Sequence, residues 1–291
     1  MMMASCMTDR RQMRHRLWQR SAWCTLLACT LSACGPSYPH QRLAQDLQAL
    51  YQREYHLPAH VQLLGNSLNV TCAIEGLLKA SEGGVEFSPT PAANGKLGDV
   101  AEAIHRAALS TDAPVEFYAI LATDPKVPGA WLMLVRCLDD VRRVYANAIA
   151  PIEFWQRTVS NLQYDPMHPP DLAHQVVHDM TLESFLALQM GKRLQNLFKA
   201  DPDFQAVYHV GSCVGEYRQG AFQFVVDVAP REAGPMTEEE TDVIFDEALR
   251  FIASILHEYH FERFSEVQLL HFPSGKTTGV PKERLWSFLP R

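Results

Sequence analysis

The sequence predicts an α+β fold made of two tandem units, each an antiparallel sheet with helices packed on one face. Segments with helical spacing of apolar residues alternate with short strand-like runs, which is typical of helices layered on sheets. The order helix, strand, strand, helix, strand occurs in residues 41–165 and again in residues 172–291. Between them, residues 165–171 hold three prolines, a density that neither a helix nor a central strand tolerates. We therefore expect a boundary there, with duplication of one unit as a hypothesis.

The first unit is predicted to start with a helix that ends before Pro58. In chain order we expect a helix over 41–55, strands over 61–64 and 68–74, a loop over 81–95, a helix from Asp99, strands over 115–122 and 131–138, a charged helical segment up to Pro151, and a short helix to about Ser160. Gly65-Asn66-Ser67 joins the first two strands, and Gly-Asn between apolar runs is typical of a hairpin turn. Asp99 is the expected helix cap, because Glu102 follows it as in a capping box.

The second unit repeats this order of elements. In chain order we expect a helix over 181–199, a strand over 204–210, a turn over 215–220, a strand over 222–228, a helix over 237–259, a strand over 267–272, and a tail after it. Thr237 and Glu240 form a capping box at the start of the long helix, whose first turn is acidic as the helix dipole favours.

The N-terminus carries the pattern of an export signal. Arg14, Arg16 and Arg20 precede an apolar run over residues 22–33, which is the order of a secretory signal peptide. The run has twelve residues, whereas a helix that crosses a bilayer needs about 20. We therefore expect a cleaved signal rather than a membrane-spanning helix.

The end of this run, Leu31-Ser32-Ala33-Cys34, resembles the lipobox of bacterial lipoproteins. The resemblance implies that residues 1–33 are removed as a signal peptide and that Cys34 carries a lipid, with residues 34–40 as a tether. Gly35 and Pro36 follow the cysteine, not the aspartate of an inner-membrane retention signal, so the resemblance implies an outer-membrane destination facing the periplasm. A chance cysteine in an ordinary signal peptide is the alternative.

The remainder of the chain resembles uncharacterised lipoproteins of similar layout only weakly. The residues that carry this second resemblance are Gly65-Asn66-Ser67-Leu68-Asn69-Val70 and Phe117-Tyr118. It implies no activity.

The charge balance excludes one class of partner. The chain has 26 Lys+Arg and 33 Asp+Glu, and residues 1–33 hold five arginines and one aspartate. The mature chain therefore has 21 basic and 32 acidic residues, a net charge of −11. Such a chain is repelled by nucleic acid and by anionic lipid surfaces, so we expect no nucleic-acid partner and a membrane attachment through the lipid alone.

Three cysteines remain in the mature chain after Cys34. Cys72, Cys137 and Cys213 all lie in apolar, strand-like runs, so we expect buried free thiols. A single disulfide with one thiol left over is the alternative, because exported proteins meet an oxidising compartment.

No catalytic or metal motif has the structural context that it needs. Gly211-Ser212-Cys213-Val214-Gly215 has the form of a nucleophile elbow, but a turn and a strand follow it instead of a helix. Ser274-Gly275-Lys276-Thr277 lacks the upstream glycine of a phosphate loop. The candidate metal ligands fall into two clusters: His168, His174 and His178 with Asp171 and Asp179, and separately His257, His260 and His271. Neither cluster has the spacing of a zinc motif, so we predict no metal and no cofactor.

The function predicted by elimination is a non-catalytic structural or assembly role. We expect a membrane-anchored periplasmic lipoprotein that binds a partner protein through exposed sheet edges or aromatic side chains. The aromatic candidates are Phe154, Trp155, Phe261, Phe264, Trp286 and Phe288. The alternative is an exported hydrolase that uses Cys213 as nucleophile or a histidine-bound metal.

Overall fold

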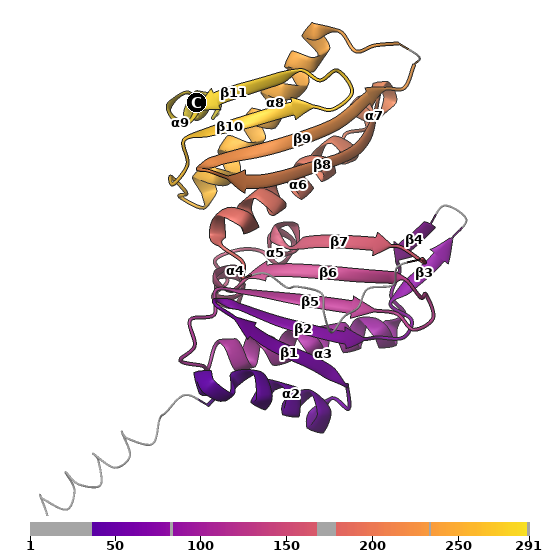
Figure 1. The fold of residues 1–291 in the computed structure, drawn as a ribbon, viewed down its shortest axis with the longest axis vertical. Coiled ribbons are helices and arrows are strands. Elements are labelled where there is room, and N and C mark those ends of the chain that lie inside the picture. Colours follow the sequence, from indigo (N-terminus) through magenta and orange to yellow (C-terminus); the bar gives the residue numbers. More distant parts are fainter. Residues whose placement is uncertain (1–36, 82–83, 168–178, 233, 290–291) are drawn as a thin grey trace, which may run out of the picture.

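The computed structural model describes residues 37–81, 84–167, 179–232 and 234–289. Helices layered on mixed sheets give it an α+β fold, as the sequence predicts (Figure 1). The expected signal peptide, the lipidation site Cys34 and part of the tether lie outside the described residues, as do most of the proline cluster and His168, Asp171, His174 and His178.

Five strands of the first half form one sheet in the order β1-β2-β5-β6-β7. Their bounds are Ala59–Leu64 (β1), Ser67–Ala73 (β2), Phe117–Thr123 (β5), Ala130–Cys137 (β6) and Val159–Tyr164 (β7). Antiparallel pairs predominate, but β2 and β5 are parallel. Helix α3 (Pro91–Ala108) connects these two strands and returns the chain to the same end of the sheet, which makes a parallel pair possible.

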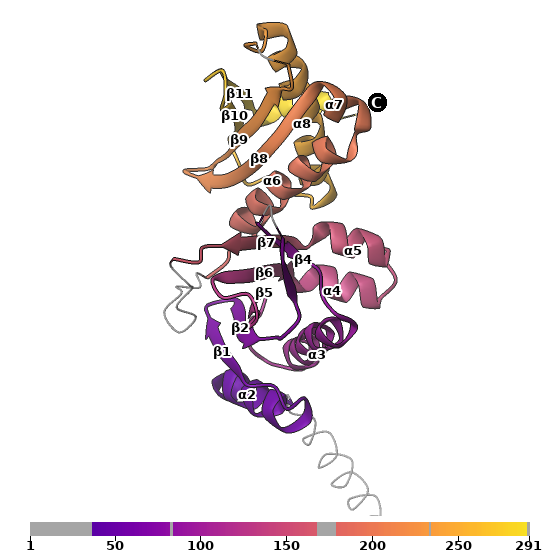
Figure 2. The ribbon, with the colours of Figure 1, turned by 90° about the vertical axis from the view of Figure 1, so that its right-hand side faces the viewer.

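Four helices cover one face of this first sheet. They are α2 (Leu43–Glu54), α3, α4 (Leu138–Tyr145) and α5 (Pro151–Arg157), preceded by the 3₁₀ turn η1 (His40–Arg42). Figure 2 shows α3, α4 and α5 on the same side of the strands. Their apolar residues form one core cluster with the inward side chains of the sheet, including Tyr118 and Ile120. We call the face turned away from these helices the outer face.

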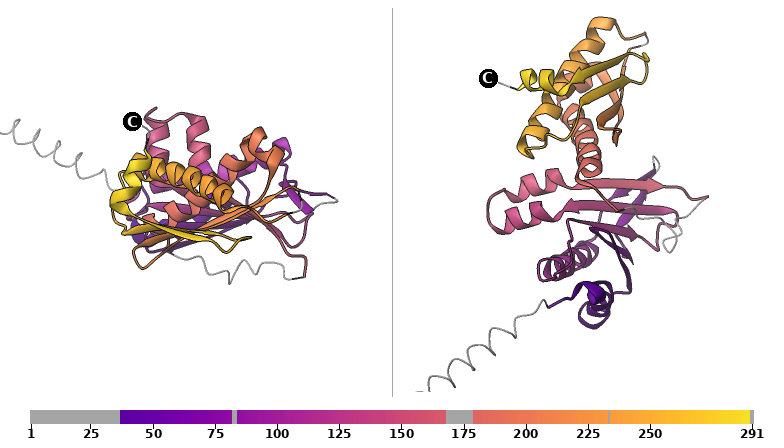
Figure 3. Two further views of the ribbon diagram at one scale, coloured as in Figure 1. Left: turned by 90° about the horizontal axis from the view of Figure 1, so that it is seen from above. Right: turned by 60° about the vertical axis from the view of Figure 1, so that its left-hand side comes forward.

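The second half forms a four-stranded sheet in the order β11-β10-β9-β8. Its strands are Tyr208–Arg218 (β8), Ala221–Pro230 (β9), Glu266–His271 (β10) and Thr277–Pro281 (β11), and its helices are α6 (Leu182–Ala200), α7 (Pro202–Val207), α8 (Glu238–Glu258), α9 (Lys282–Leu285) and the 3₁₀ turn η2 (Trp286–Phe288). Again an antiparallel hairpin, a helix, a parallel strand and an antiparallel strand follow one another. Seen from above, the helices lie on one side of both sheets (Figure 3).

A second cluster of buried apolar residues contains side chains from both halves of the chain. It is built mainly from α6, α8 and the second sheet, but it extends to Phe117, Val135 and Val159 on the outer face of the first sheet. The rings of Phe117 and Phe185 lie 5.4 Å apart, and Phe185 belongs to α6. Helix α6 is therefore packed against both sheets.

A buried ion network joins the halves beside this core. Arg157 on α5 is 3% exposed, and it contacts Asp140 at 2.9 Å, Glu153 at 2.6 Å and also Glu258 at the end of α8. The Tyr259 hydroxyl donates to the second carboxylate oxygen of Asp140 at 2.8 Å. Burial raises the pKa of the Asp140 carboxyl, although Arg157 and Tyr259 both donate hydrogen bonds to it. Both halves thus contribute charge to one desolvated site.

Several predicted elements are corrected in the first half. Residues 81–95, expected as a loop, contain strand β4 (Gly84–Phe87), which pairs with β3 (Leu78–Ser81), and the start of α3. The cap of α3 is Thr90, whose hydroxyl accepts from Ala93 N, and not Asp99, which lies inside the helix. The segment expected to remain helical to about Ser160 ends at Arg157 and is followed by β7. Only Val159 of β7 is buried, so its strand pattern is weak.

The second half differs from its prediction in three places. Phe204 lies in the short helix α7 rather than a strand, because Asp201 caps it and Pro202 follows at its first position. Strand β8 continues through Gly215 to Arg218, and the turn is only Gln219-Gly220. The expected tail holds β11, whose single buried residue is Val280. The capping box of Thr237 and Glu240 is confirmed.

Close backbone contact between α6 and β8 explains Gly215, which follows Cys213 on β8, and Gly191 on α6. A Cβ atom on Gly215 would lie 2.1 Å from Ala187 O, and one on Gly191 would lie 2.7 Å from Gly215 N. The helix therefore rests directly on the strand, with no side chain between them. The motif predicted as a candidate nucleophile elbow serves here as a packing surface.

We predict that Gly215→Ala lowers the free energy of unfolding by about 1–3 kcal/mol or more, since neither the α6 nor the β8 backbone has space for the methyl group. The measurement is urea unfolding followed by circular dichroism. Gly95→Ala is the matched control: it has open space in α3 and should stabilise by about 0.5–1 kcal/mol. Equal effects of the two substitutions would contradict the proposed contact.

Candidate functional site

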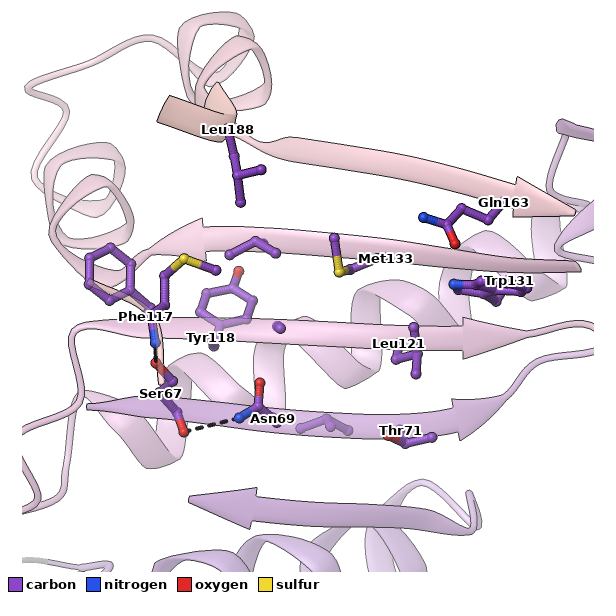
Figure 4. A pocket seen from close by; sticks show the side chains of 14 residues that line it. Ser67, Asn69, Thr71, Phe117, Tyr118, Leu121, Trp131, Met133, Gln163 and Leu188 are labelled. Carbon is purple, nitrogen blue, oxygen red and sulfur yellow. Dashed lines mark hydrogen bonds between the residues drawn. The ribbon is translucent and has the colours of Figure 1, made fainter. Parts of the chain in front are cut away.

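A pocket lies on the outer face of the first sheet, next to α6. Its volume is about 390 Å³, within the range of roughly 300–1,000 Å³ that ligand sites occupy. The described lining residues are Ser67, Asn69, Val70, Thr71, Phe117, Tyr118, Ala119, Leu121, Trp131, Met133, Val135, Gln163, Met180 and Leu188 (Figure 4). None of them carries a charged side chain.

Strand pairing brings these side chains together from distant parts of the chain. Asn69 on β2 is paired with Ala119 on β5, which is paired with Val135 on β6. Residues paired across strands point to the same face, so alternate residues of β2, β5, β6 and β7 form one surface. Met180 and Leu188 add apolar surface from the α6 side. No motif in the sequence indicates this pocket. The one available signal is that Ser67, Asn69 and Thr71 alternate with apolar residues on a single strand, which places polar groups on one face of the sheet.

A small polar group lies at one end of the pocket. The Asn69 amide nitrogen donates to Ser67 O at 3.3 Å, and the amide oxygen has no hydrogen bond from a described residue (Figure 4). The Ser67 hydroxyl accepts from Met180 N at 2.6 Å and donates to Asp179 at 3.1 Å. Because the Ser67 hydroxyl proton is already donated to Asp179, the pocket offers Asn69, Thr71 and Gln163 as neutral hydrogen-bonding groups beside an apolar floor.

Asp179 has a structural role in place of the metal-ligand role considered for it. Its carboxylate accepts from Asn66 N at 2.9 Å and from the Ser67 hydroxyl, and it fits beside the turn because residue 65 is glycine. A Cβ atom on Gly65 would lie 2.0 Å from this carboxylate, and the φ of Gly65 is +54°. Asp179 thus fastens the start of the second half to the first hairpin.

The remaining histidine cluster does not form a metal site. The rings of His257 and His260 lie 6.2 Å apart, and His271 is buried between Val228 O and the Ser274 hydroxyl, each at 2.7 Å. Within the described ranges, no group of three or more histidine, cysteine, aspartate or glutamate residues could hold a metal ion.

The three cysteines of the described residues, Cys72, Cys137 and Cys213, are buried free thiols. Cys213 lies inside β8, and burial together with nearby Asp227 raises its pKa to about 12. Burial raises the pKa of Cys72 to about 12 and that of Cys137 to about 11. A thiol in this state is not a nucleophile near neutral pH.

In the segment that resembles a phosphate loop, Lys276 contacts Asp242 at 2.7 Å.

A second polar cluster lies on the helix side of the first sheet. Arg136 donates from Nε to the Thr158 hydroxyl at 3.0 Å and from Nη1 to the Tyr118 hydroxyl at 3.1 Å. His105 Nε2 lies 2.7 Å from that same hydroxyl, and its Nδ1 lies 3.3 Å from the Tyr145 hydroxyl. Burial, and then the Arg136 cation, lower the pKa of His105 to about 4.

Comparison with protein-family models, curated proteins and solved structures finds no match to this chain. In the part of the chain that the structure describes, no helix combines the length and apolar character needed to cross a bilayer.

We predict that His105 makes the fold less stable in mild acid. Its folded pKa of about 4 lies below the ordinary 6.5, so the unfolded chain binds a proton that the folded chain does not. The contribution of neutral His105 to the free energy of unfolding is complete above pH 6.5 and is lost as the pH falls towards 4. Urea unfolding at pH 7 and pH 5 should show a loss of about 2 kcal/mol in wild type that His105→Gln removes. Substitution of the exposed His60 by Gln should leave the loss unchanged, and an unaltered pH dependence in His105→Gln would refute this assignment.

Proposed function

We propose that this protein is a membrane-anchored periplasmic lipoprotein with a non-catalytic structural or assembly role, and that it binds a partner protein through the pocket on the first sheet. The observation that carries the proposal is the pocket itself, an apolar surface with neutral hydrogen-bonding groups at its margin. Its occupant is an extended segment of the partner that places apolar side chains in the pocket.

The chemistry of the lining supports a peptide occupant. Trp131, Met133 and Leu188 provide apolar surface, and methionine adapts to side chains of different shapes. The amides of Asn69 and Gln163 donate and accept hydrogen bonds, which matches the alternating N–H and C=O groups of an extended backbone. The described lining residues offer no positive group to a phosphate or a carboxylate.

The N-terminal pattern supports the anchored location. Leu31-Ser32-Ala33-Cys34 resembles a lipobox, and the first described helical turn, η1, starts at His40. A lipid on Cys34 would hold the domain close to the membrane on a tether of only a few residues. A partner in the same membrane would then be met at a high local concentration.

We predict that the neutral apolar fluorophore N-phenyl-1-naphthylamine binds the pocket and that acetyl-Leu-Gln-Leu-amide displaces it. Ala119→Phe places a ring on the pocket floor and should weaken fluorophore binding at least tenfold. Val225→Phe, the matched substitution on the second sheet, should not. Equal binding by Ala119→Phe would overturn the proposed site, and displacement by octanoate but not by the peptide would overturn the choice of a peptide.

We predict that the mature protein begins at Cys34 and carries a diacylglycerol there. Intact-mass spectrometry of membrane-derived protein should give this mass, and Cys34→Ala should remove the protein from the outer-membrane fraction. Cys29→Ala, a matched change within the removed segment, should leave both results unaltered. An unmodified residue 34, or a mature chain that still contains Arg20, would disprove lipidation.

A further inference from the structure

The two buried arginines of the described chain differ in one respect. Arg157 is 3% exposed and contacts three carboxylates, whereas Arg136 is 5% exposed and has no carboxylate within 4.0 Å among the described residues. Burial of an unpaired charge costs several kcal/mol, typically more than one aromatic contact returns. In a mature chain with 32 acidic residues and 21 basic ones, a buried arginine without an acid is an exception.

Aromatic rings hold the Arg136 guanidinium in place. Its central carbon lies 4.7 Å from the centroid of Phe154 and 4.5 Å from that of Trp155. Nε and Nη1 have acceptors, whereas Nη2 has no hydrogen bond with a described residue and is not fully buried. Nη2 therefore keeps a donor that an acceptor from outside could use.

Exposed apolar side chains lie on α4 and α5, the helices next to this position. Trp155 is 57% exposed, Ile152 is 67% exposed and Tyr145 is 60% exposed. Tyr145 on α4 is linked to Arg136 through the buried side chains of His105 and Tyr118. Ile152 and Trp155 are three positions apart on α5, so they share one face of that helix. Figures 2 and 3 show α4 and α5 side by side and projecting from the first sheet.

We propose that this surface, formed by Tyr145, Ile152, Trp155 and Arg136, binds a partner protein through an acidic side chain that is flanked by apolar residues. The carboxylate accepts from Arg136 Nη2, and the apolar neighbours pack on Ile152 and Trp155. Tryptophan, tyrosine and arginine are the residue types most enriched at interface hot spots. A projecting helix pair offers area to a protein rather than a concave site to a small anion. This inference does not depend on the pocket of the first sheet.

The test uses ¹⁹F NMR of the purified chain labelled with 5-fluorotryptophan, because Trp131 reports the pocket and Trp155 reports the α4–α5 surface. The probes are acetyl-Leu-Glu-Leu-amide and its neutral counterpart acetyl-Leu-Gln-Leu-amide. We expect the acidic peptide to shift the Trp155 signal saturably, with an affinity at least tenfold higher than that of the neutral peptide. Arg136→Gln should abolish this difference.

A second variant keeps the test decisive if Arg136→Gln does not fold. Ile152→Glu adds a negative charge at an exposed position of the surface and should weaken the acidic peptide at least fivefold. Val243→Glu, at a position 64% exposed on α8, is the matched control and should not. Three results would each overturn the proposal: no shift of Trp155, equal affinities for the two peptides, or a Trp155 shift given only by anionic phosphatidylglycerol vesicles. A shift of Trp131 alone would leave the pocket proposal standing.

Discussion

One buried guanidinium, that of Arg157, determines how the two halves of the chain meet. It receives Asp140 and Glu153 from its own half and Glu258 from the other. A buried ion pair adds little stability compared with a well-packed apolar alternative, but loss of one partner leaves an uncompensated charge and costs about 3–5 kcal/mol. The network therefore acts mainly against other arrangements of the halves, because each of them would remove Glu258 from Arg157 and the Tyr259 hydroxyl from Asp140.

The pocket depends on this arrangement. Leu188, which lines it, is followed on α6 by Gln189, whose amide donates to Arg157 O at 2.7 Å and to the Tyr259 hydroxyl at 2.9 Å. Helix α6 is held from its other side by direct backbone contact with β8. The outer face of the first sheet thus forms a bounded pocket only because α6, from the other half, is held next to it.

The features that could be read from the sequence are those with local causes. The turn at Gly65 and the capping box at Thr237 each depend on a few adjacent residues, and both occur as predicted. The start of α3 was obscured by Gly95, whose low helix propensity is outweighed by the Thr90 cap and by burial of Leu97. The pocket and the ion network could not be predicted from the sequence. In the network, for example, Arg157 and Glu258 are separated by 101 positions, and no local pattern connects them. The two glycines around Cys213 resemble a catalytic motif, but the α6 backbone requires Gly215 and the Asp227 side chain requires Gly211, and both neighbours lie elsewhere in the chain.

The separation of strand pairing between the halves bears on how the chain acquires its fold. Every strand of the first sheet precedes residue 165, and every strand of the second follows residue 207. The hairpins close loops of only a few residues, and the parallel pair of β2 and β5 requires nothing beyond Thr123, so loop-closure entropy stays modest. Synthesis from the N-terminus onwards therefore completes the first sheet before α6 is made. The order of synthesis matches the order in which the parts can assemble, and the later half docks on a surface that is already formed.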